Sequence, residues 1–121
     1  MKIIYFIFQV KKEILYCIIN ILYHCNYKQI QDLLDNNLVK ILLNILSGSN
    51  ESQIVILIIH CFDSLLNFFD AIKKEKEENV IVKLIENNNG AIIFEKLQKH
   101  PDEAVYKKLE EFIKKHFEKA E

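Results

Sequence analysis

The chain has 121 residues, half of them hydrophobic, so it is long enough to bury one ordinary core or a few stacked repeats. Gly occurs twice and Pro once, which argues against a turn-rich β architecture, and the abundance of Leu, Ile, Lys and Glu favours helices. The 16 basic residues, all lysine, are balanced by 17 acidic ones, so we expect no field that attracts nucleic acid. The composition predicts an all-α protein.

The cysteines and the apolar opening residues indicate where the protein acts. Three cysteines with no secretory signal fit reduced thiols in the cytoplasm or nucleus. The uninterrupted apolar core of the opening, residues 3–8, is too short for a signal sequence and is followed by Lys11, Lys12 and Glu13. No apolar run approaches the roughly 20 residues that span a bilayer. We therefore expect no membrane partner.

The predicted helices follow one another in a simple order. A long helix over about 10–24 comes first, after an opening that does not fit the later pattern. Three helices follow over about 28–35, 38–46 and 51–69, with residues 47–50 (SGSN) as the break and cap before the last. Three more follow over about 80–86, 91–98 and 101–117, where Pro101 suits the first position of a helix.

An internal repeat underlies this order. At an offset of 51 residues, apolar positions of the first set fall on apolar positions of the second, for example Ile30 on Ile81, Leu46 on Leu97 and Ile58 on Leu109. The charged residues 73–78 lie between the copies, and we expect a solvated loop or a helix extension there. Without that insertion the period is about 42 residues, which is typical of armadillo repeats.

The sequence thus predicts an armadillo-type, right-handed superhelical solenoid of three-helix repeats. The expected divisions are a divergent or mis-set start (1–8), the third helix of an incomplete repeat (9–26), a repeat (27–72), a charged loop (73–79) and a terminal capping repeat (80–121).

Two polar stripes interrupt the apolar long helices. Aligning these helices by their Asn residues places Glu13, Tyr16 and Asn20 opposite His60, Asp63 and Asn67. Residues three and four apart share one face of a helix, so each set forms one stripe. In a solenoid such stripes would line a groove that can hold an extended peptide.

These stripes carry a resemblance to the importin-α family. Residues 12–20 (KEILYCIIN) resemble that family's eighth repeat, with Tyr16 in place of the usual Trp, and Asp63 with Asn67 resembles the ninth. Residues 27–34 (YKQIQDLL) resemble the segment that opens a repeat, and residues 90–121 resemble the last repeat, including FEKLQKH and EAVYKK. The resemblance covers about residues 9–117.

The resemblance implies a fragment of a nuclear import adaptor, without enzyme activity or cofactors. Its partners would be cargo proteins with Lys/Arg-rich localisation signals, held by Glu13, Tyr16, Asn20, Asp63 and Asn67. Asn20 would bond the peptide backbone, Tyr16 would pack on a cationic side chain and Glu13 would pair with its charge. The recycling exportin would contact the surface over residues 91–117, and the protein would act in cytoplasm and nucleus.

The same residues also permit other functions. The alternative is a helical-repeat scaffold for protein–protein interaction outside transport, with Asn20 and Asn67 as ordinary helix-surface residues, Tyr16 as a core aromatic and Glu13 as a solvated acid. The pairs His24-Cys25 and His60-Cys61 suggest zinc only weakly, since neighbouring helical residues point about 100° apart, and we expect core thiols instead. We find no catalytic motif in the sequence.

The first long helix raises one further expectation. It lacks the rest of its repeat, so its apolar face, including Ile14, Ile18 and Ile21 with residues 3–8, has no cover. We expect self-association or marginal stability unless the opening residues fold back.

Overall fold

The computed structural model describes residues 2–117, apart from the side chains of residues 2 and 4, and this part of the chain is helical without any strand. The all-α prediction is therefore confirmed. The helices are α1 (Lys2–His24), α2 (Tyr27–Asp35), α3 (Leu38–Ser47), α4 (Ser52–Ile72), α5 (Val80–Asn87), α6 (Gly90–Leu97) and α7 (Glu103–His116).

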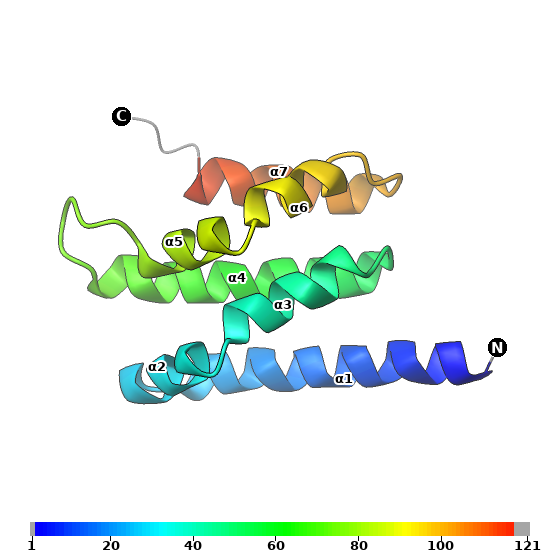
Figure 1. Ribbon diagram of the computed structural model, residues 1–121, viewed down its shortest axis with the longest axis horizontal. Helices are drawn as coiled ribbons and strands as arrows, with labels where there is room; N and C mark the ends of the chain where they lie inside the picture. The colour runs from blue at the N-terminus through cyan, green and yellow to red at the C-terminus, as the bar shows by residue number, and fades with distance from the viewer. Residues whose placement is uncertain (1, 118–121) are drawn as a thin grey trace.

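The three long helices form one layer. In Figure 1, α1, α4 and α7 lie side by side and run in the same direction, with α4 in the middle and in contact with both neighbours. The short helices form the second layer, in which α3 contacts both α5 and α6. The described chain is thus α1 followed by two three-helix units, α2–α3–α4 and α5–α6–α7, stacked on one another.

Helix α4 supplies the centre of the hydrophobic core. Nine of its residues are buried, and Ile54, Val55, Ile58, Cys61 and Phe62 have no exposed surface. Fully burying a side chain such as Ile or Phe stabilises the fold by about 1.5–3 kcal/mol, so α4 contributes more than any surface contact. Phe62 also meets Phe94 of α6 edge to face, with ring centroids 6.4 Å apart.

The length and apolar composition of α4 differ from our expectation that no apolar stretch is long enough to span a bilayer. Although His60, Asp63 and Asn67 interrupt its apolar runs, its 21 residues are long and apolar enough to cross a bilayer. Half of the most apolar stretch is buried inside the protein, and the core helix of a soluble protein can have the same length and composition. Packing against α1, α3, α5 and α7 accounts for the apolar composition of α4.

Burial follows the 51-residue repeat. Ile30 and Ile81 are both buried, as are Ile58 and Leu109, and Leu46 and Leu97. The same offset relates Leu65 of α4 to His116 of α7, and both are buried. Equivalent positions of the two units therefore face the same core, although one of them carries a polar ring.

Asparagines set several helix boundaries. Asn26 caps α2 with a capping box, accepting from the Gln29 backbone N–H while its own N–H donates to the Gln29 side chain. Asn37 and Asn89 begin α3 and α6 in left-handed backbone conformations, with φ of 69° and 64°. Asn tolerates that region better than most residues, so these positions allow the tight turns between short helices.

Several predicted helix ends were wrong, including the end of α4, which lies at Ile72 rather than near residue 69. Helix α1 begins at Lys2 rather than near residue 10, so residues 3–8 continue the helix. Pro101 precedes α7, which is capped by the Asp102 side chain accepting from the Ala104 N–H, 2.8 Å away. The cap of α4 is Glu51, without a side-chain cap bond, rather than a residue of the break at 47–50. Residues 73–79 form a mostly exposed loop, the first of the two expected forms.

The two glycines provide a matched test of the packing between α5 and α6. A Cβ added to Gly90 would lie 2.8 Å from the Ile85 carbonyl oxygen, whereas one added to Gly48 would have nothing nearer than 3.6 Å. We predict that Gly90→Ala lowers the free energy of unfolding by about 1–3 kcal/mol through overpacking, measured by urea denaturation.

Gly48→Ala should change the free energy of unfolding by less than about 1 kcal/mol in either direction, because φ at Gly48 is −98° and an added Cβ would be in ordinary van der Waals contact. Equal effects of the two variants would contradict the close approach of α6 to Ile85.

Candidate functional site

The stripe on α1 faces solvent. Glu13, Tyr16 and Asn20 are exposed, and the opposite side of α1 buries Leu15 and Leu22 in the core. Tyr16 keeps 49% of its surface exposed, so it is not a core aromatic. Within residues 2–117 none of these three stripe residues has a polar side-chain partner. Their hydrogen-bonding groups are thus open to solvent or to a ligand.

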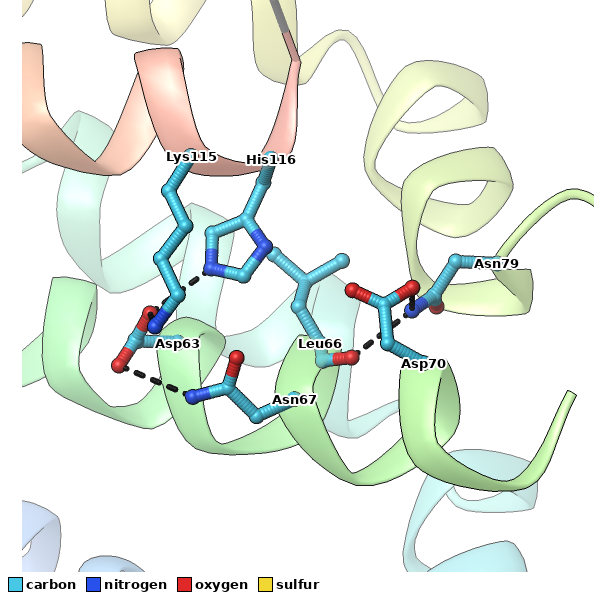
Figure 2. A network of polar contacts seen from close by, with 7 residues as sticks. All are labelled: Asp63, Leu66, Asn67, Asp70, Asn79, Lys115 and His116. Carbon is cyan, nitrogen blue, oxygen red and sulfur yellow. Dashed lines mark hydrogen bonds and ion pairs between the residues drawn. The ribbon is translucent and has the colours of Figure 1, made fainter. Parts of the chain in front are cut away.

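The stripe on α4 contacts α7 through Asp63. His60 and Asn67 are exposed, whereas the Asp63 carboxylate is partly buried and accepts from His116 Nε2 at 2.7 Å and from Lys115 Nζ at 3.2 Å (Figure 2). Asn67 Nδ2 lies 3.4 Å from the same carboxylate, a long hydrogen bond. Asp63 and Asn67 therefore belong to a polar network that ties α4 to α7.

The ionisation of Asp63 reflects this network. Partial burial alone raises the pKa of the carboxyl, but hydrogen bonds from His116 and Lys115, with the attraction of the lysine charge, outweigh burial. The net result is a pKa below its ordinary value. The carboxylate is therefore charged at neutral pH and holds both α7 side chains.

His116 is the most buried member of the network. Its side chain is 1% exposed, and its ring lies against Phe112 with centroids 5.1 Å apart. Nε2 faces the Asp63 carboxylate and donates the hydrogen bond to it. The other nitrogen, Nδ1, is buried without a partner in the described chain, which is tolerable for a bare acceptor but costly for an N–H.

A second polar cluster lies further along α4 and has a structural role. The buried Asn79 side chain donates to the Leu66 carbonyl and to Asp70, each at 2.9 Å (Figure 2). Its oxygen accepts from the Ile81 N–H at 2.9 Å and so caps α5. Asn79 thereby fixes the start of the second unit onto the end of α4.

A hollow between α4 and α7 continues the stripe. His60 and Asp63 lie on one side, and Lys108, Glu111 and Lys115 lie on the other. The α7 residues have the same three-and-four spacing as the two predicted stripes, but sequence reasoning missed them. Most surface positions of α7 are charged, so only the contact with α4 distinguishes these three.

The cysteines do not gather at this site. Cys61 is buried, and burial raises the pKa of its thiol to about 12, as expected of a core cysteine. Cys25 is half-buried and packs against the core, whereas Cys17 is exposed. Among the residues described, no group of three or more His, Cys, Asp or Glu side chains is placed to hold a metal ion.

Comparisons with protein-family models, with curated proteins and with solved structures found no match to this chain.

The Asp63 network predicts a specific pH dependence of stability. A folded pKa below the unfolded value contributes stability that is present at neutral pH and is lost as pH falls from about 4 through the folded pKa. Asp63→Asn should cost no more than about 1 kcal/mol at pH 7, because the pair is partly screened by solvent. The difference from the wild type should shrink towards pH 2.

Urea denaturation from pH 7 to pH 2 measures this difference. Asp32→Asn, at an exposed carboxylate of α2, is the matched control and should leave the acid dependence unchanged. A constant gap between wild type and Asp63→Asn across this range would contradict a stabilising pair with His116 and Lys115.

Proposed function

We propose that this chain is an armadillo-type adaptor module, similar to the end of an importin-α, that binds an extended Lys-rich peptide along the α1 and α4 stripes. Such a peptide carries the chemistry of a nuclear localisation signal. The protein would act in nuclear transport between cytoplasm and nucleus, as a binding protein and not as an enzyme.

The observation that carries this proposal is the open stripe on α1 beside the stripe on α4. Glu13 offers a negative charge, Tyr16 an aromatic face and Asn20 an amide, at successive turns of one exposed face. These groups can respectively pair with a lysine, pack on its aliphatic stem and bond a peptide backbone. Tyr is a weaker cation–π partner than Trp, so each contact is modest.

The charge distribution favours the α1 end of this surface. A peptide lysine at Asp63 would have to displace Lys115, whose ammonium group already lies 3.2 Å from the carboxylate. Lys108 and Lys115 beside the α4–α7 hollow also repel a basic peptide. We therefore centre the proposed peptide on Glu13, Tyr16 and Asn20 and assign Asp63 and Asn67 a lesser part.

A second partner fits the other end of the chain. The resemblance implies that the recycling exportin contacts part of the last repeat, residues 91–117, which form most of α6 and all of α7. Exposed charged residues of both signs, including Glu95, Lys96 and Lys107, would supply such a contact.

The internal pairing of Asp63 favours one alternative, a scaffold with no preference for basic peptides. In that case the α4 stripe serves to join α4 to α7, and the exposed α1 stripe meets a partner of different chemistry.

Fluorescence anisotropy of a labelled bipartite localisation peptide tests the proposal. We predict binding that weakens between low and physiological salt, because charge pairs are screened. Asn20→Ala should raise the dissociation constant about five- to tenfold, the effect expected for one lost hydrogen bond.

Asn44→Ala, which removes an exposed asparagine from α3, is the matched control and should leave binding unchanged. No binding at low salt, or an equal loss in both variants, would reject the peptide groove and leave the scaffold as the better account.

A further inference from the structure

Helix α1 has a second apolar face that no part of the described chain covers. It consists of side chains at alternating spacings of four and three residues over three heptads, and each is exposed: Ile3, Ile7, Val10, Ile14, Cys17 and Ile21. Ile3 keeps 73% of its surface and Ile14 48%. The face carries no charged side chain.

This face differs from both surfaces of α1 already described. Leu15 and Leu22 point into the core, and Ile18, which we had expected on the open face, packs against the core as well. With 100° per residue, the exposed heptad face points roughly 110° away from the direction of Leu15 and Leu22, and by about the same angle away from the polar stripe. A helix docked there is clear of α4.

The heptad spacing identifies what kind of partner fits. Spacings of three and four residues produce the seam of a coiled coil, in which each apolar side chain enters a gap between four residues of another helix. Ile7, Ile14 and Ile21 occupy one set of seam positions and Ile3, Val10 and Cys17 the other, so every seam position carries an apolar side chain or a thiol. The partner is therefore an apolar helix of similar length.

We propose that this face pairs with the same face of a second copy, forming a parallel two-stranded α1–α1 interface. An isologous pair needs a self-complementary surface, and an uncharged seam of three heptads meets that condition. In a parallel pair, Ile14 and Cys17 each meet their own counterparts, and Lys11 lies beside Phe6 of the other copy. In an antiparallel pair, the same flank of each helix would lie beside its counterpart on the other copy. Lys11 would then lie beside Lys11 and Glu13 beside Glu13, and these like charges would repel each other.

The pairing continues a pattern already present within the chain. Helices α1, α4 and α7 are parallel, and each adjacent pair is in contact (Figure 1). The outer face of α1 is the next free position at that end of the layer. A second α1 placed there extends the layer without covering Glu13, Tyr16 or Asn20, so the interface is independent of the proposed peptide groove.

Sedimentation velocity of the whole chain over a range of concentrations tests the pairing. We expect a reversible dimer, and Ile14→Glu should raise its dissociation constant at least about 100-fold, because two carboxylates would face each other in an apolar seam. The control is Ile41→Glu on α3, since Ile41 is 47% exposed and lies outside the seam. Circular dichroism confirms that both variants remain helical.

Oxidative crosslinking tests the register. Mild oxidation should link Cys17 to Cys17 in the dimer, and Cys17→Ser should abolish the link while the half-buried Cys25 and the buried Cys61 remain. A monomer at the highest soluble concentration overturns the proposal, as does a dimer that Ile14→Glu leaves intact. A dimer that Ile14→Glu dissociates but that gives no Cys17 link overturns the parallel arrangement.

Discussion

The burial of α4 between α1 and α7 is the constraint on which the other helices depend. Its apolar side chains point in almost every direction, so α4 has no stable environment unless other helices surround it. The short helices α3 and α5 complete that enclosure. Each unit buries its apolar faces only by stacking on another, as in repeat proteins generally.

Polar residues break the apolar surface of α4 in one stripe, and the fold uses that break. Asp63 holds His116 and Lys115, and further along the helix the Leu66 carbonyl and Asp70 hold Asn79. Buried polar groups cost free energy when unpaired, so such contacts restrict how α5 and α7 can sit on α4. The network thereby fixes the positions of α5 and α7 on α4 more specifically than apolar contacts alone would.

The two ends of the long-helix layer differ in chemistry. At the α7 end, charged side chains of both signs face solvent. Asp63 and Lys115, which line the hollow beside α4, already form an ion pair with each other. At the α1 end, an open polar stripe and an uncovered apolar seam lie on adjacent faces of one helix. Helix α1 carries both the proposed peptide site and the proposed dimer interface, because the side chains on these two faces have few partners within the described chain.

Much of the fold could be predicted because local signals and apolar periodicity agree. The 51-residue repeat predicted which positions share an environment, and helices α2, α3, α5 and α6 lie within a residue or two of their predicted bounds. Boundaries that depend on competing local choices were less predictable. Pro101 and Asp102 both suit the start of a helix, and the capping bond to Ala104 decided between them.

The candidate site was predictable only in part, for a physical reason. Spacing along a helix determines which side chains share a face, so the stripes of Glu13, Tyr16 and Asn20 and of Asp63 and Asn67 followed from sequence alone. Whether a carboxylate is free or paired depends on a residue some 50 positions away. Asp63 meets His116 only because α7 packs beside α4. The sequence by itself determined the helices and their faces, and the tertiary structure decided which of those faces remain open.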